Sequence, residues 1–270
     1  MIDTSGMSSF LALKLIGRER DKFETNIEKD PTSRREIAAF RERIGSIGSV
    51  EELTEDFEVF SFVMKSFGFE DQLYAKGMMK KILVTDPAEK SSLAARMNSG
   101  AFKVMAETLG FGSDGAAPDD FGKAEWVDGM VARYIDQRLI DTQTAVSATV
   151  GDGLYFEQHA ADMKSWYSVL ADERMSAVVR TALGLPEDLG KANIDAQARL
   201  LSRKMDIEDL QDPEKVQSLL SKYAAINDAN SAYMAGQDLI ASLFGSTTSS
   251  GSWNKVTIDL EALTGWSAPR

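Results

Sequence analysis

The sequence has no cysteine and only one histidine, His159. Without cysteine the chain cannot form disulfides, thiolate metal sites or a cysteine nucleophile. A lone histidine has no second imidazole to complete a zinc site or a di-iron pair of Glu-x-x-His helices. We therefore expect His159 to be a solvent-facing or core-edge residue, and we predict no metal site and no cofactor.

The sequence is also poor in basic charge and in long apolar runs. It carries 30 lysines and arginines against 42 aspartates and glutamates, a formal net charge of −12. Nucleic-acid binders need basic surface to displace counterions from phosphates, and anionic membranes repel acidic proteins. No stretch approaches the ~20 apolar residues of a transmembrane helix. We therefore predict neither nucleic-acid binding nor membrane insertion.

The start of the chain bears on localisation. The apolar run at residues 10–16 is short, is preceded by no basic segment and is followed by no small-residue cleavage site. These features do not fit a Sec signal peptide, so a cytoplasmic location is the simplest expectation.

The motifs that usually carry catalysis are missing as well. No Gly-x-Ser-x-Gly elbow occurs, and the glycines of GFGSDG, residues 110–115, lack the Lys-Ser/Thr of a phosphate-binding loop. Asp114, Asp119 and Asp120 do not follow the ligand spacing of an EF-hand. Paired carboxylates stand near predicted helix starts, where capping explains them. We therefore predict that the protein is not an enzyme.

Helical periodicity dominates what the sequence does contain. Phe57, Phe60, Val63, Met64 and Phe67 recur at the spacing of one helix face and form an apolar stripe. Similar patterns run along most of the chain and predict an all-α fold of many helices. They include one first helix over residues 11–23 and separate helices over residues 213–225 and 229–244.

One sequence pattern that ends a helix occurs twice in the chain. FVMKSFGFED, residues 62–71, and VVRTALGLPED, residues 178–188, each end an apolar helix on a hydrophobe–Gly–hydrophobe step and restart on an acid. Glycine there suits the left-handed conformation that closes a helix. Setting Gly68 on Gly184 also matches Ser49 with Ser165, Asp56 with Asp172, and the Asp-Pro steps at residues 86–87 and 212–213. This predicts a duplicated helical unit, with chance agreement between amphipathic helices as the alternative.

The duplication suggests the domain organisation. Glycines, a proline and aspartates make residues 111–122 an expected linker, because such residues bury little surface. We predict a first helical unit over residues 1–110 and a second over residues 123–245. Residues 246–270 begin as a low-complexity stretch and are expected to form a mobile tail with a short strand at VTIDL.

The repeated stretch also carries a family resemblance. SVEELTEDFEVFSFVMKSFGFEDQLYAKGMMKKIL, residues 49–83, resembles the hallmark block of the family called domain of unknown function twelve-seventeen. Residues 91–111, 170–186 and 207–220 are similar to further blocks of alphaproteobacterial members, so the likeness spans residues 10–227. Genes of this family often lie in flagellar clusters, which implies a motility role by association. The matching blocks are packing and turn motifs, and they bring no catalytic residue with them.

These observations lead to a hypothesis of function. We expect a non-enzymatic flagellar accessory protein that contacts another protein, which could be a flagellar component. It would be cytoplasmic, flagellum-associated, or exported by the flagellar apparatus. Four arginines, Arg34, Arg35, Arg41 and Arg43, cluster on one predicted helix and are candidates for an acidic partner, although a solvated charged face is the default. The alternatives are an enzyme or small-molecule binder with a pocket between the two units, and a cytoplasmic export chaperone. The oligomeric state is left open.

Overall fold

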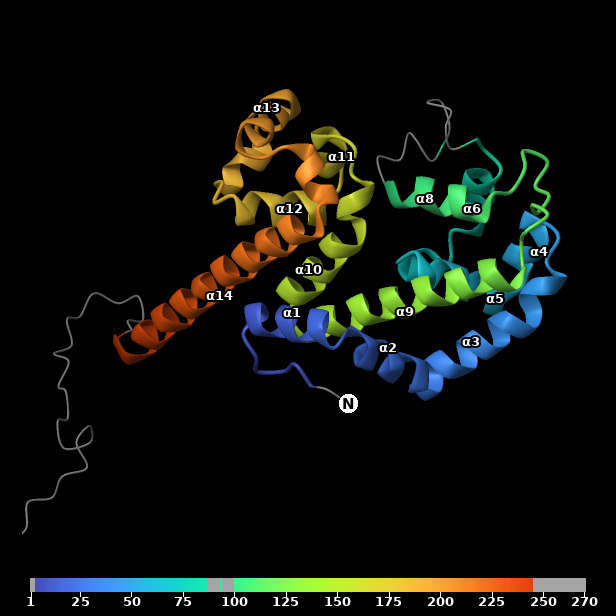
Figure 1. The fold of residues 1–270 in the computed structure, drawn as a ribbon, viewed down its shortest axis with the longest axis horizontal. Helices are drawn as coiled ribbons and strands as arrows, with labels where there is room; N and C mark the ends of the chain where they lie inside the picture. The colour runs from blue at the N-terminus through green and yellow to red at the C-terminus, as the bar shows by residue number, and fades with distance from the viewer. Residues whose placement is uncertain (1–2, 87–92, 94–99, 245–270) are drawn as a thin grey trace, which may run out of the picture. The chain divides into compact units, whose positions relative to one another are not determined.

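The computed structural model describes residues 3–86, residue 93 and residues 100–244, although the side chains of Glu187 and of residues 234–244 are not described. The all-α prediction is confirmed: this part of the chain contains helices and no strand (Figure 1). The α-helices are α1 (Ser9–Arg18), α2 (Arg20–Lys29), α3 (Pro31–Arg43), α4 (Val50–Glu55), α5 (Phe57–Ser66), α6 (Lys76–Leu83), α8 (Gly100–Leu109), α9 (Ala124–Val146), α10 (Ala148–His159), α11 (Trp166–Ala171), α12 (Glu173–Ala182), α13 (Ile194–Lys204) and α14 (Pro213–Phe244).

Five short 3-10 helices connect these elements. They are η1 (Ile44–Ser46), η2 (Glu70–Gln72), η3 (Ala160–Asp162), η4 (Glu187–Lys191) and η5 (Ile207–Gln211). By its internal contacts the chain divides into a large compact unit, Met1–Asp228, and a second unit, Ala229–Arg270. The site described below lies entirely in the large unit.

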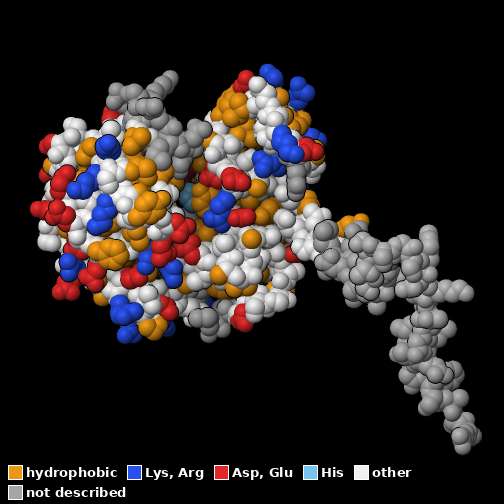
Figure 2. Space-filling model, turned by 180° about the vertical axis from the view of Figure 1, so that it is seen from behind, with side chains coloured by type: hydrophobic (Ala, Val, Ile, Leu, Met, Phe, Trp, Pro, Cys, Tyr) orange, Lys and Arg blue, Asp and Glu red, His pale blue; other side chains and the backbone are white. Residues whose placement is uncertain are grey.

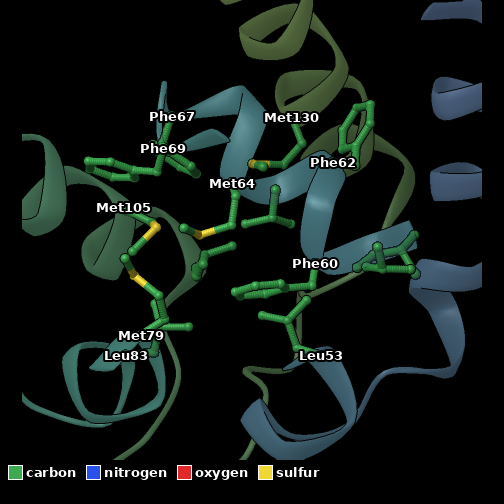
Figure 3. Close-up of a cluster of buried hydrophobic side chains, with 14 of the residues drawn as sticks. Leu53, Phe60, Phe62, Met64, Phe67, Phe69, Met79, Leu83, Met105 and Met130 are labelled. Carbon is green, nitrogen blue, oxygen red and sulfur yellow. The ribbon is translucent and has the colours of Figure 1, made fainter. Parts of the chain in front are cut away.

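Helix α9 organises the first hydrophobic core. Its Tyr134 ring stacks on Phe62 of α5 at 4.5 Å between centroids, and Phe62 stacks on Phe40 of α3 at 4.1 Å. Met64, Met79 and other apolar side chains of α4, α5, α6 and α8 fill the space beside this stack (Figure 3). Stacked aromatic rings add to the stabilisation that burial of their area provides. The stack therefore joins α3, α5 and α9 into one layer of packed helices.

Two further clusters complete the unit. One lies around Phe156 of α10 and Val178 of α12, and it extends to Leu219 of α14. The other joins Ile16 of α1 to Leu139 of α9 and Leu154 of α10. Helix α9 contributes to the first core and to the cluster around Ile16, and α10 contributes to both of the further clusters. The compact unit therefore includes both of the halves that the sequence suggested.

The repeated helix ending is present at both places with the same local geometry. Gly68 and Gly184 have φ angles of 73° and 64°, in the left-handed region that favours glycine. The amide of Phe69 donates to the carbonyl of Met64 at 2.8 Å, and that of Leu185 donates to the carbonyl of Arg180 at 2.9 Å. These are the closing bonds of a Schellman motif.

The likeness extends to the elements before each glycine. Ser49 and Ser165 cap helices of 6 residues, and Asp56 and Asp172 cap the helices of 10 residues that follow. The segments α3–η1–α4–α5 and α10–η3–α11–α12 thus follow the same order, at the same spacing before Gly68 and Gly184. This is a local repeat of structure. Duplication of a whole unit stays a prediction, and the Asp-Pro step at residues 86–87 lies partly outside the described residues.

Several sequence predictions differ from the structure in detail. The expected first helix is two helices separated at Glu19, and the two helices expected over residues 213–225 and 229–244 are one, α14. Phe57, a member of the apolar stripe, is 60% exposed. It is the first residue of α5 and lies at the end of the stripe, where other helices do not cover it. The tail and its VTIDL segment lie outside the described residues.

Residues 111–122, the expected linker, pack against the first core. The Phe121 ring contacts both Phe111 and Trp126, at centroid distances of 5.0 and 4.5 Å. The amide of Val50 donates to the carbonyl of Gly115 at 2.9 Å. The glycines and the proline shape the turns of this segment, while its two phenylalanines attach it to the core.

Candidate functional site

The candidate site is built on the exposed stripe of α9. One face of this helix is buried, but Asp128, Gly129 and Ala132 are exposed, and Asp136 is partly exposed one turn further on. These positions lie on one face of the helix. A Cβ built on Gly129 meets no atom within 4 Å. The surface of the stripe therefore lies close to the helix backbone at Gly129 and Ala132, and a hollow lies on either side of the stripe.

The first hollow lies between α2, α3 and α9 and has a volume of about 340 Å3. It is lined by Glu24, Glu28, Arg41, Asp128, Val131, Ala132, Ile135 and Asp136. Four carboxylates face one arginine here, while Val131 and Ile135 supply apolar surface. Arg41 Nη2 pairs with Asp128 Oδ1 at 2.7 Å, and both side chains are about half exposed. An exposed pair of this kind contributes only about 0–1 kcal/mol, so it can open at little cost.

Arg20 fixes the carboxylates at the inner side of the first hollow. Its guanidinium pairs with Glu24 at 2.8 Å, with Asp136 at 2.6 Å and with Glu157 of α10 at 3.6 Å. The same arginine therefore ties α2, α9 and α10 together. Burial raises the pKa of the Glu157 carboxyl, and the nearby Arg20 charge opposes that rise. Glu28 is exposed and has no ion-pair partner in the described part of the chain.

The second hollow lies between α9, the end of α10 and η3, with a volume of about 290 Å3. It is lined by Gly129, Ala132, Arg133, Asp136, Gln158, His159 and Asp162. The second hollow is bordered on the stripe by Gly129, Ala132 and Asp136. Two of these residues, Ala132 and Asp136, also border the first hollow. In Figure 2 the histidine surface appears inside a hollow of the large unit, with acidic side chains gathered nearby.

The geometry of His159 sets its hydrogen-bonding role. Its Nδ1 lies 2.8 Å from the carbonyl oxygen of Tyr155, and its ring stacks on the Tyr155 ring at 4.2 Å. A carbonyl can only accept, so Nδ1 carries the proton and Nε2 of the neutral ring is an acceptor. Burial lowers the pKa of His159 and so favours this neutral form.

Two other residues of the second hollow are unusual. Arg133 places its guanidinium carbon 4.8 Å from the centre of the Phe67 ring, and burial lowers its pKa. The Oε1 atom of Gln158 is buried and has no hydrogen-bond partner among the described residues. A buried acceptor without a donor costs free energy, so it calls for a functional explanation.

The four arginines predicted from the sequence lie in different surroundings. Arg41 lines the first hollow, whereas Arg43 pairs with Asp56 at 2.6 Å and with Glu58 at 3.4 Å. Arg34 and Arg35 are exposed, and neither takes part in an ion pair within the described residues. Whether any of the four contacts a partner stays a prediction, but two of them are already paired with acids of their own chain.

Sequence reasoning missed most residues of the two hollows. His159 was expected to be a solvent-facing or core-edge residue, but its place in a hollow depends on α9, which approaches it from another part of the chain. The signal available in the sequence was the stripe of polar and small residues at Asp128, Gly129, Ala132 and Asp136, which recur at helical spacing on one face of the helix.

The described residues show no group of three or more His, Cys, Asp or Glu side chains that could hold a metal ion. In the same part of the chain, no helix is long and apolar enough to cross a membrane.

Comparison with known proteins identifies the family. The family model described as protein of unknown function (DUF1217) matches residues 66–216. The chain belongs to this family. The match includes every residue that lines the second hollow, whereas Glu24, Glu28 and Arg41 of the first hollow lie before it.

A solved structure supports the fold of this family member. The crystal structure of a protein from Agrobacterium tumefaciens is similar, with 30% sequence identity and a TM-score of 0.73. The alignment covers 81% of this chain and 92% of the Agrobacterium chain. No protein with a curated description matches the chain.

Proposed function

We propose that this protein is a non-enzymatic accessory protein of the flagellar system that works by binding another protein, and that the two hollows beside α9 are its contact surface. The observation that carries the proposal is their shape and chemistry. They are open, adjoin each other across Ala132 and Asp136, and are lined mostly by charged and polar side chains.

The form of this surface supports a macromolecular partner. Gly129 and Ala132 let a partner approach the α9 backbone closely, and the hollows on either side can receive its side chains. Interfaces combine such pockets with a polar, solvent-accessible rim. A chaperone groove would instead be long and apolar, and neither hollow has that character.

The flagellar context is supported by the resemblance rather than by the geometry. The family's gene neighbourhoods associate it with motility, and the chain belongs to that family. The hollows supply the surface through which such an association could act, while the family itself has no assigned activity.

The experiment is a crosslinked pull-down of the tagged protein from motile cells, with identification by mass spectrometry. The blocking variant is Ala132→Trp, which places a large ring between the hollows at an exposed helix position. The matched control is Ala225→Trp, at an exposed position of α14 that lines neither hollow.

We expect hook, rod or export components to be enriched with the wild type and the control and to be lost with Ala132→Trp. Capture of only abundant background proteins by the wild type would contradict the flagellar role. Equal capture by Ala132→Trp would show that the partner binds elsewhere. Both variants should first be checked by circular dichroism for an unchanged fold.

A small-molecule binder is the second candidate, favoured by the position of the first hollow. That hollow lies between α2 and α3 of the predicted first half and α9 of the second, where the sequence suggested a ligand pocket. A thermal-shift screen of metabolites tests it. A ligand that raises the Tm of the wild type but not of Ala132→Trp would support this candidate, and no shift with any compound would count against it.

A further inference from the structure

We propose that the second hollow receives a carboxylate, carried by an aspartate or glutamate side chain of the partner protein, and that Arg133 binds it. This inference rests on the proposed function, because it names the chemistry that the partner brings to the same surface. It comes from the one half-buried arginine that has no hydrogen-bond acceptor among the described residues.

Arg133 differs from the other half-buried arginines in the described part of the chain. Arg20, Arg138 and Arg174 each pair with a carboxylate. Arg180 donates to a serine hydroxyl. Arg133 makes no ion pair and no hydrogen bond with any described residue, so all of its N–H donors are left without a protein acceptor. A half-buried cation without such acceptors is costly, which makes it a candidate for ligand binding.

The Phe67 ring and the hollow fix the surroundings of the Arg133 guanidinium. Its carbon lies 4.8 Å from the centre of the Phe67 ring, which covers one side of the group. Burial lowers the pKa of His159, and the nearby Arg133 charge adds to that lowering. Both Arg133 and His159 line the hollow. The N–H groups lie at the edge of the guanidinium plane, so they remain available to the two oxygens of a carboxylate.

The neighbouring polar groups are compatible with an entering carboxylate. The Oε1 atom of Gln158 is buried, and its Nε2 makes no hydrogen bond among the described residues, so this amide can donate to the ligand. Asp136 is already paired with Arg20 at 2.6 Å. Asp162 is exposed, where water and salt screen its charge. Of the charged groups that line the hollow, Arg133 is the one that is both half-buried and unpaired.

His159 links this binding to a proton. Its Nδ1–H donates to the Tyr155 carbonyl, so Nε2 of the neutral ring carries no proton. A carboxylate bound beside the ring favours the imidazolium form, whose Nε2–H can donate to it. The other charged and titratable groups around the ring are Arg133 and Asp136 of α9, Tyr155 of α10, Asp162 of η3 and Asp172 at the start of α12. Binding should therefore raise the pKa of His159 and become tighter as the pH falls through that pKa.

The test uses the chain's single histidine as a reporter. The His159 signals are followed by NMR in the full-length, histidine-labelled protein. The probe is the α-amide of N-acetyl-glutamate, and the control compound is N-acetyl-glutaminamide, which has nearly the same shape without the charge. We expect saturable shifts and a raised His159 pKa with the glutamate compound, and little change with the glutamine compound. Absence of a saturable shift, or equal shifts with both compounds, would overturn the inference.

The variant Arg133→Met makes the test sharper, because it keeps an unbranched side chain beside Phe67 and removes the guanidinium. It should bind the glutamate compound at least about tenfold more weakly, a usual factor for a hydrogen bond to a charged group. Its Tm should be unchanged or higher, because a half-buried charge without a partner is lost. Unchanged affinity in this variant would refute the role of Arg133.

Two further variants separate binding from a purely structural role. Arg133→Lys keeps the charge but loses the planar fork, so it should bind with intermediate affinity. Arg199→Met is the matched control, at an exposed position of α13 that lines neither hollow, and it should bind like the wild type. Equal loss of affinity in Arg133→Met and Arg199→Met would show that only the net charge of the protein matters and would contradict a seat at Arg133.

The two proposals fail in different ways. If partner capture is blocked by Ala132→Trp but the glutamate compound does not shift His159, the contact surface stands and the carboxylate seat is wrong. If the glutamate compound binds but no flagellar component is captured, the seat stands and the flagellar role fails.

Discussion

Asp228 of α14 accepts the backbone amide hydrogen of Ser9 at 2.8 Å, across 219 residues of sequence. Its second carboxylate oxygen accepts from Phe10 at 3.0 Å. A carboxylate at the N-terminus of a helix satisfies free amides and faces the positive end of the helix dipole. The end of the large unit thus holds its first helix in place.

The first prediction concerns this contact. Asp228→Ala should lower the free energy of unfolding by about 1–2 kcal/mol, because two buried or half-buried amides lose a charged acceptor. Asp228→Asn keeps one acceptor oxygen but loses the charge, so it should cost less. Urea denaturation of the three proteins checks this order, and equal stability of all three would show that α1 is held by its apolar contacts alone.

A second prediction concerns the corner between α9 and α10. A Cβ on Gly151 would lie 2.7 Å from the Cα of Thr144, a backbone atom that cannot move aside. Gly151→Ala should therefore destabilise the protein by about 1–3 kcal/mol, as overpacking commonly does. Gly129→Ala is the control, since its Cβ meets open space in a helix, and it should stabilise by up to about 1 kcal/mol. Thermal unfolding distinguishes the two, and a loss of similar size in both would contradict the packing argument.

The repeated helix ending yields a third prediction. Gly184→Ala forces a residue with a Cβ into a left-handed conformation, at a cost of about 1–2 kcal/mol. Gly68→Ala should cost more, because its Cβ would also lie 3.3 Å from the side chain of Gln137. Gly184→Asn should recover part of the loss, since asparagine tolerates this conformation. If Gly184→Ala were neutral, the Schellman closure at that site would contribute nothing.

The fourth prediction is a pH dependence from His159. Burial lowers the pKa of its imidazole in the folded state below the ordinary value of 6.5, so the unfolded chain takes up a proton first as the pH falls. The contribution to stability is fully present above about pH 6.5 and is lost as the pH falls toward the folded pKa. Comparing Tm between pH 8 and pH 5 for the wild type and His159→Gln isolates this part. We expect the wild type to lose more stability on acidification, and parallel curves would contradict the assignment.

Much of the fold could be predicted because it depends on local chemistry. Apolar residues at helical spacing place the helices, Ser49 and Asp56 cap two of them, and Gly68 closes the second. Each of these effects acts over a few residues, so the sequence around it is sufficient. Errors arose where neighbouring helices decide the outcome, as at Glu19, where one predicted helix became two, and in α14, where two became one.

The candidate site could not be predicted to the same degree. Gln158 and His159 follow each other in the chain, but the hollow that they line exists only because Ala132 and Asp136 of α9 face them. The orphaned oxygen of Gln158 and the direction of the His159 Nδ1–H bond are consequences of packing. No local pattern contains that information.

The sequence by itself determined an acidic, cysteine-free, all-α protein, the helix ending at Gly68 and Gly184, and the family to which the chain belongs. The tertiary structure decided which face of α9 stays open, that residues 111–122 pack against the first core, and which side chains line the two hollows. Caps and periodicity are short-range properties of the chain, whereas exposure and hollows depend on contacts between residues far apart in it.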